Sequence, residues 1–246
     1  MGSLKRVLRE AAERVIGPGR VGRLEYYLGY QKHFYPWRGP MNGQTARAEI
    51  VRQIITECGV ELIVETGTYR GTTTEWFAQF GIPVITIELS ERFAEFSRMR
   101  LRNCANVQLL VGNSAETLRV IVGRVPKAEA ITLFYLDAHW MDHLPLREEL
   151  ETIFAHFSRA LVVVDDFKVE GDPSYRYDDY GPGKALTLEY VQAAKLPALS
   201  IFFPSVKAEH ETGAKRGCVI MTANERLAAS LAKISLLNSW TGGSSA

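Results

Sequence analysis

One stretch constrains the fold more than any other part of this chain: Glu61-Leu-Ile-Val-Glu-Thr-Gly-Thr-Tyr-Arg-Gly-Thr-Thr73. Its apolar residues predict a short strand that ends at the acid Glu65, and a turn containing Gly67 and Gly71 follows at once. The next residues, 74–78, are compatible with a helix. A strand, a glycine turn and a helix start in direct succession are typical of the first unit of a nucleotide-binding α/β sheet. Such a turn offers backbone N–H groups and a helix N-terminus to one ligand.

The glycine spacing in this stretch narrows the class of ligand. A dinucleotide-binding turn requires G-x-G-x-x-G, but the second and third glycine places, counted from Gly67, hold Tyr69 and Thr72. The pattern Glu65-x-Gly67-x-x-x-Gly71 instead resembles the first motif of class I S-adenosylmethionine (SAM) methyltransferases, in which an acid precedes the glycine turn. By itself the motif is equally compatible with an ordinary strand-to-helix turn.

Length and composition indicate a globular protein and argue against several classes of partner. The 246 residues suffice for one large α/β domain, and the 46% hydrophobic and 23% charged residues are ordinary for a soluble chain. A formal net charge of +1 gives no reason to expect a nucleic acid or an anionic membrane as a partner. The three cysteines, Cys58, Cys104 and Cys218, are too widely spaced for a metal cluster. Since the sequence has neither a spanning apolar run nor a signal-peptide pattern, we expect a cytoplasmic protein.

From residue 46 onward, apolar strand patterns alternate with helical ones. We predict strands at 62–64, 83–88, 107–111, 131–136 and 160–164, and a final hairpin of strands at 199–203 and 217–222. Continuous apolar strands that alternate with helices predict an α/β fold whose parallel sheet is buried on both faces. Residues 168–184 are rich in Gly, Pro, Tyr and Asp, which predicts a binding loop or a lid.

An N-terminal extension, residues 1–45, precedes the predicted domain at 46–240, and residues 241–246 form a flexible tail. Residues 4–16 have apolar side chains along one side of a helix, which favours packing on the body of the protein or on a second subunit. Residues 26–40 are dense in aromatic side chains and helix breakers. We therefore expect the extension to form a cap over an acceptor pocket or a contact in a homo-oligomer.

Nearly every predicted strand ends in a side chain that can bind or titrate: Glu65, Glu88, Asn113, Asp137 with His139, and Asp165 with Asp166. Ligands of open α/β sheets lie beyond the carboxyl ends of the strands, so we expect these side chains to meet at one edge. Glu88 is placed to accept hydrogen bonds from the two hydroxyls of a ribose. Asn113 suits either a contact with the adenine edge or a helix cap. The predicted cofactor-binding residues are Glu65, Thr66, Gly67, Tyr69, Gly71, Glu88, Asn113 and Ser114.

The aspartates at the ends of two neighbouring strands indicate a cation. Asp137, Asp165 and Asp166 would repel one another unless an oxygen-preferring divalent cation joined them. A bound Mg²⁺ would polarise an acceptor hydroxyl and lower its pKa. With Asp137, His139 is the predicted catalytic residue, because the ordinary pKa of histidine, about 6.5, suits proton transfer near neutrality. The alternatives are that the aspartates only cap backbone groups at the strand ends and that His139 has a structural role.

Three segments together resemble the small-molecule O-methyltransferases of the macrocin O-methyltransferase type. They are Glu65-Thr-Gly-Thr-Tyr-Arg-Gly71, Leu136-Asp-Ala-His-Trp140 with Pro145-Leu-Arg-Glu-Glu-Leu150, and Val164-Asp-Asp-Phe167. The resemblance covers roughly residues 46–222 and implies a doubly wound sheet of seven strands, the last one antiparallel. It also implies SAM as methyl donor, Mg²⁺ at Asp137, Asp165 and Asp166, and a small polar acceptor such as a sugar or a glycosylated natural product. Such relatives often carry an acid where this chain has His139.

Three other functions are compatible with parts of this pattern. Asp137-x-His139-x-x-Asp142-His143 superficially resembles the zinc-binding run of metal-dependent hydrolases, although the spacing differs by one residue. A non-catalytic subunit that binds SAM or a nucleotide would need the glycine turn but not the three aspartates. NAD-dependent oxidation is disfavoured by Tyr69 and Thr72 at the glycine places.

Overall fold

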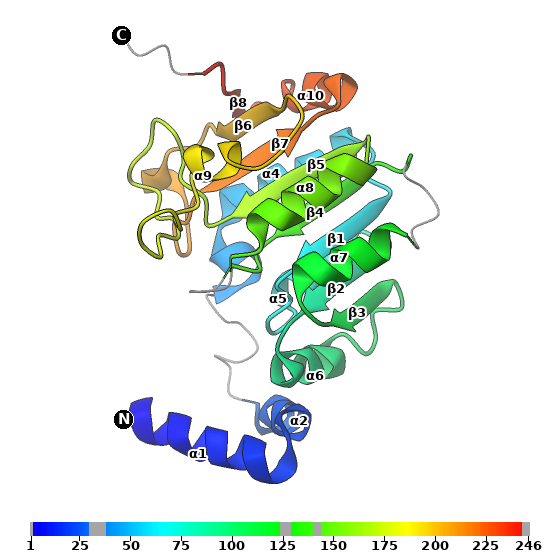
Figure 1. Cartoon of the computed structure of the whole chain (residues 1–246), viewed down its shortest axis with the longest axis vertical. Helices are drawn as coiled ribbons and strands as arrows, with labels where there is room; N and C mark the ends of the chain where they lie inside the picture. The colour runs from blue at the N-terminus through cyan, green and yellow to red at the C-terminus, as the bar shows by residue number, and fades with distance from the viewer. Residues whose placement is uncertain (1, 30–37, 124–128, 140–143, 243–246) are drawn as a thin grey trace.

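The fold is organised around a sheet of eight strands in the part of the chain that the structure describes. This computed structural model describes residues 2–29, 38–123, 129–139 and 144–242. The strands are β1 (Leu62–Thr66), β2 (Val84–Glu88), β3 (Val107–Val111), β4 (Thr132–Leu136), β5 (Ala160–Asp165), β6 (Ser200–Pro204), β7 (Cys218–Thr222) and β8 (Leu237–Ser239). Their order across the sheet is β3-β2-β1-β4-β5-β7-β6-β8 (Figure 1).

Strands β1 to β5 run parallel, whereas β7, β6 and β8 each pair antiparallel with their neighbours. The mostly parallel sheet and the final hairpin of β6 and β7 are therefore confirmed. An eighth strand adds to the seven expected ones, because β8 pairs with the outer edge of β6 and places Ser239 opposite Phe202. Three residues are too few to show a strand alternation, so the sequence pattern did not indicate this strand.

Helices cover both faces of the sheet, and a separate hydrophobic core lies on each side. One core packs against α7 (Ser114–Val122), α8 (Leu146–His156) and α9 (Leu188–Gln192); the other packs against α4 (Thr45–Glu57), α5 (Thr72–Ala78) and α10 (Glu225–Leu231). Neighbouring strand residues alternate between the two cores, as Leu133 and Phe134 of β4 do. The predicted doubly wound α/β fold is confirmed, since helices α7 and α8 lie in front of the sheet and α4 behind it (Figure 1).

The N-terminal extension forms two helices, α1 (Gly2–Ile16) and α2 (Pro18–Leu28). The helix expected at 4–16 is confirmed, and Pro18 begins the second helix directly after the glycine that ends the first. Helix α2 packs along α6 (Glu91–Arg100) at one end of the molecule, while Leu8 and Val15 of α1 remain exposed (Figure 1). The cap or oligomer contact stays a prediction, and residues 30–37 and 243–246 lie outside the described part. No helix in the described part is long and apolar enough to cross a membrane.

Candidate functional site

The carboxyl ends of β2, β1, β4 and β5 lie side by side at one edge of the sheet. Thr66 is in register with Leu136, and Leu136 is in register with Val164. Asp137 therefore follows β4 directly beside the glycine turn after β1 and the two aspartates at the end of β5. Parallel pairing of the strands alone brings these strand ends together, as expected from the sequence.

Gly67 allows the turn after β1 to lie against the end of β4. Its φ is +86°, and a Cβ at this position would lie 2.3 Å from the carbonyl oxygen of Asp137. Any side chain would therefore push the turn away from Asp137. Tyr69 also has a left-handed φ of 49°, which a non-glycine residue adopts at a cost of about 1 kcal/mol or more. The turn is thus a close-packed, strained segment that ends at Gly71, where α5 begins.

Glu88 at the end of β2 holds this turn in place. One carboxylate oxygen accepts the backbone N–H of Tyr69 at 2.6 Å, and the other accepts the N–H of Ser90 at 2.8 Å. Burial raises the pKa of Glu88, and the backbone donors lower it again in part. Each oxygen still has acceptor capacity for a ligand hydroxyl.

Glu65 supports the turn from within the protein. Its carboxylate accepts hydrogen bonds from the hydroxyls of Thr74 and Thr86, the latter at 2.6 Å. Burial raises its pKa to about 7, and the two threonine hydroxyls oppose that shift. Glu65 thus joins β1, β2 and α5 beneath the glycine turn.

Thr66 and Ser114 lie beside a buried acid that was not predicted from the sequence. Glu149 of α8 is fully buried, and burial raises its pKa to about 7 while the hydroxyls of Ser114 and Thr66 oppose the shift. A sequence signal for Glu149 was present, since position 149 falls on the apolar helix face formed by 146, 150 and 153.

The Asn113 side chain accepts the N–H of Glu116 at 3.2 Å and so caps α7, which is one of the two roles predicted for it.

Replacing Glu149 with glutamine should stabilise the protein at alkaline pH. The wild-type carboxyl ionises inside the fold above about pH 7, against an ordinary value of 4.5, so the free energy of unfolding decreases as the pH rises through this window. The gain from Glu149→Gln should grow from near zero at low pH to at most about 3 kcal/mol at pH 8. Urea unfolding at pH 5 and pH 8 measures it. The control Glu148→Gln, at an exposed position paired with Arg119, should show no such growth. An equal effect of both variants would contradict the assignment.

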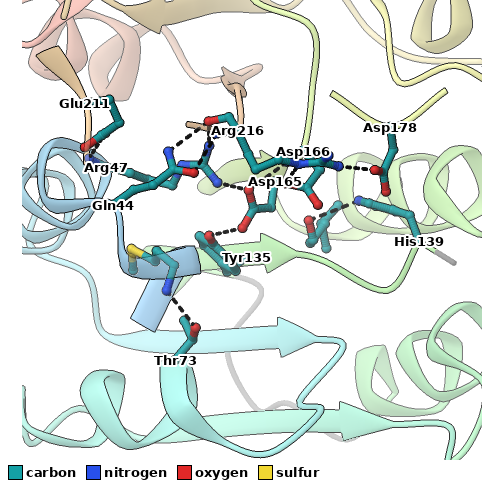
Figure 2. Close-up of polar contacts among 12 residues, drawn as sticks. Gln44, Arg47, Thr73, Tyr135, His139, Asp165, Asp166, Asp178, Glu211 and Arg216 are labelled. Atoms are coloured by element: carbon teal, nitrogen blue, oxygen red, sulfur yellow. Dashed lines mark hydrogen bonds and ion pairs between the residues drawn. The ribbon is translucent and has the colours of Figure 1, made fainter. Parts of the chain in front are cut away.

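Asp165, the last residue of β5, is bound by other groups of the protein. Its carboxylate is fully buried, forms an ion pair with Arg47 of α4, and accepts the hydroxyl of Tyr135 at 2.6 Å. The N–H of Asp166 completes its shell at 2.7 Å. Figure 2 shows Arg47 and Tyr135 converging on this carboxylate from different elements.

Asp166, the second aspartate, is engaged by another arginine. Arg216 donates from Nε to its carboxylate at 2.7 Å and from Nη2 to Asp178 (Figure 2). Gln44 fixes the Arg216 backbone by donating to its carbonyl at 2.9 Å and accepting its N–H at 2.7 Å. The φ of Asp166 is 54°, so this residue is also in a strained left-handed conformation.

The three aspartates do not fit a common magnesium site in this arrangement. Within the described ranges, no group of three or more His, Cys, Asp or Glu side chains is placed to hold a metal ion. Guanidinium groups neutralise Asp165 and Asp166, each through one carboxylate oxygen, and the other oxygen of Asp165 accepts the Tyr135 hydroxyl. The zinc run of the alternative hydrolase cannot be placed, since Asp142 and His143 lie outside the described residues.

His139 is buried next to the strand ends, and its pKa is lower than the one expected for a catalytic base. Its Nε2 lies 3.2 Å from the carbonyl oxygen of Leu136, which can only accept, so Nε2 carries the proton. Nδ1 is then an acceptor, and it is buried without a partner among the described residues. Burial lowers the pKa of His139 to about 4, well below the ordinary value on which the prediction rested.

Asp137 is the aspartate that no arginine pairs with in the described part of the chain. The residue as a whole is partly accessible, but its carboxyl group is enclosed by protein. Burial and the neighbouring Asp166 raise its pKa well above the usual range, against an opposing effect of Arg47. Asp137 is therefore the one of the three predicted metal-binding aspartates whose carboxylate is not bound by an arginine in the described part of the chain.

The loop at 168–184 lies over this edge of the sheet, as expected for a binding loop. Tyr180 donates its hydroxyl to Asp178 and lies 3.3 Å from the carbonyl oxygen of His139. The backbones of Arg176 and Arg216 form an isolated β-bridge, which anchors the loop to the segment before β7. Neither Asp178 nor Tyr180 could be singled out among the many polar residues of the loop by sequence alone.

Comparison with solved structures identifies the fold. A protein from Staphylococcus aureus, with the proposed activity of a caffeoyl-CoA O-methyltransferase, matches with a TM-score of 0.52 and 19% identity over 71% of this chain and 81% of that one. The SAH-bound methyltransferase PaMTH1 from Podospora anserina matches with a TM-score of 0.53 and 18% identity over 87% and 95%. Cofactor-bound Rv0187 from MTB matches with a TM-score of 0.50 and 17% identity over 89% and 96%.

These likenesses establish a class I methyltransferase fold. At the level of sequence, no protein-family model and no curated protein matches the chain.

Proposed function

We propose that this protein, whose fold is that of class I methyltransferases, is a SAM-dependent O-methyltransferase acting on a hydroxyl of a small polar molecule, such as a sugar or a glycosylated natural product. The observation that carries the proposal is the position of Glu88, whose carboxylate accepts the Tyr69 N–H at 2.6 Å beside the glycine turn. A ribose bound there would place its hydroxyls on Glu88 and the rest of the cofactor along Gly67 and Gly71. Ser114, at the start of α7, would line the adenine side.

When bound, SAM supplies an electrophilic methyl group on a sulfonium. Asp137 is the residue of this chain that would accept the hydroxyl proton of the acceptor, because no arginine of the described residues pairs with its carboxylate and its backbone touches Gly67. His139, as a neutral imidazole, would orient the acceptor hydroxyl through Nδ1 rather than act as the base. Asp137 would thus hold the proton lost by the acceptor oxygen as that oxygen takes the methyl group, and S-adenosylhomocysteine would be the leaving group.

Magnesium is not part of this proposal. The sequence and the resemblance predicted it at Asp137, Asp165 and Asp166, but Arg47 and Arg216 pair with two of these carboxylates. Equal turnover after dialysis against EDTA and after addition of Mg²⁺ is the expected result. Loss of turnover with EDTA and recovery with Mg²⁺ would restore the metal to the mechanism.

Calorimetric titration with S-adenosylhomocysteine (SAH) and with NAD tests the cofactor. We expect SAH to bind and NAD not to bind; the reverse result would overturn the proposal. Incubation with methyl-labelled SAM and a panel of sugars and glycosides then tests the reaction through label in the product. SAH binding without any methyl transfer would favour the non-catalytic SAM-binding alternative.

Glu88→Gln should weaken SAH binding about tenfold to a hundredfold, because a charge-assisted hydrogen bond to the ribose becomes a neutral one. Titration of SAH into the variant measures the loss. Glu91→Gln removes an exposed acid three residues later and is the matched control, with unchanged affinity expected. Equal affinities of the two variants would remove Glu88 from the cofactor site.

A further inference from the structure

An arginine of the glycine turn reaches out of the turn to the N-terminal extension. Arg70 is nearly buried, and its guanidinium lies 5.2 Å from the ring centres of Tyr69 and Phe96. Its Nη2 is 3.3 Å from a carboxylate oxygen of Glu25 in α2. Among the described residues, Glu25 is the only acid that forms an ion pair with Arg70.

Glu25 also joins the turn to α6. Its second oxygen lies 3.4 Å from Arg92, which is in turn 3.4 Å from Glu13 of α1. Burial lowers the pKa of Arg92, and the nearby Arg70 acts in the same direction, whereas Glu25 and Glu13 oppose the shift. Two close arginines, one from the turn and one from α6, are therefore held together by acids of the extension.

Helix α2 is fixed closely enough to α6 to make this contact specific. A Cβ at Gly22 would lie 2.0 Å from the carbonyl oxygen of Arg92, so the two backbones touch. Arg23 adds an ion pair with Glu95 of α6 at 2.6 Å. The Arg23–Glu95 pair lies on the same interface between α2 and α6, but it does not include a residue of the glycine turn.

We propose that Glu25 is a positioning residue for the cofactor site: the extension holds the glycine turn in its binding conformation through Arg70. The inference rests on the proposed function, since the turn is taken as the SAM site. Arg70 follows Tyr69, whose N–H is bound by Glu88 and whose carbonyl accepts the Ser97 hydroxyl at 2.7 Å. Without Glu25, the Arg70 guanidinium is left without its acid and is drawn toward water. Because the two residues are adjacent, this movement loosens the strained Tyr69 backbone.

The test compares Glu25→Gln with Glu95→Gln in the full chain. Glu25→Gln should weaken SAH binding roughly fivefold to fiftyfold, and the amide of Tyr69 should exchange its hydrogen faster in the absence of ligand. Glu95→Gln removes the Arg23 pair from the same interface and should leave SAH binding within about twofold of the wild type. Similar changes in both variants would overturn the proposal, because they would reflect only general loosening of α2.

A double variant separates positioning from overall stability. In an Arg70→Gln background, Glu25→Gln should have no further effect on SAH affinity, whereas additive losses would overturn the proposal. If the wild type binds no SAH, the proposed function fails, and the exchange rate of the Tyr69 amide still decides the positioning role. If the wild type binds SAH and Glu25→Gln changes neither affinity nor exchange, the positioning role alone fails.

Discussion

Replacing Arg47 with methionine should lower the free energy of unfolding by about 3–5 kcal/mol. The ion pair between Arg47 and Asp165 is shielded from water, with side-chain exposures of 2% and 0%. Methionine fills similar space but leaves the Asp165 carboxylate with only the Tyr135 hydroxyl and a backbone N–H as donors. An uncompensated buried charge is among the most destabilising changes known for a single substitution.

Urea unfolding of the Arg47→Met variant measures this loss. The matched control is Arg52→Met in the same helix, which removes an exposed pair with Glu49 and should cost less than about 1 kcal/mol. Adding Asp165→Asn to Arg47→Met should recover part of the loss, because it removes the stranded charge. A cost of Arg47→Met no larger than that of Arg52→Met would contradict the assignment of a buried ion pair.

Asp137→Asn should lower kcat about 10²- to 10⁴-fold while leaving SAH affinity within about tenfold. The amide keeps the shape of the side chain and its place beside Gly67, but it cannot take a proton from the acceptor hydroxyl. Steady-state turnover with an accepted substrate and SAH titration together separate chemistry from binding.

Two further variants locate the proton acceptor. Asp179→Asn changes an exposed aspartate of the loop over the site and should keep wild-type kcat. His139→Ala should lower kcat less than Asp137→Asn does, since burial keeps the pKa of this histidine at about 4. A full rate for Asp137→Asn, with a large loss for His139→Ala, would return the role of base to the histidine.

Much of the fold followed from local patterns. Apolar runs of strand length predicted all strands except β8, and the glycines at 67 and 71 predicted the turn after β1. Helix caps were also readable, because Ser90 and Asn113 precede α6 and α7 and accept the N–H groups that these helix starts expose. Such features depend on neighbours within a few residues, so one sequence is enough to indicate them.

The partners of the strand-end acids were not readable in this way. Arg47 and Asp165 are separated by more than 100 positions, and only the packing of α4 against the sheet brings them together. The sequence did contain part of the signal. Arg47 falls on the helix face of Ile50, Val51 and Ile54, as a charged residue on a buried stripe.

By itself, the sequence determined a doubly wound α/β chain with acids gathered at the carboxyl edge of its sheet, because strand and helix periodicity and glycine turns are local properties. Only the tertiary structure decided what neutralises those acids. A carboxylate in a buried edge needs a positive partner, and several chemically different partners meet that need. Here the packed helices and loops bring Arg47 and Arg216 to Asp165 and Asp166, and among the three strand-end aspartates they leave Asp137 without an arginine in the described part of the chain.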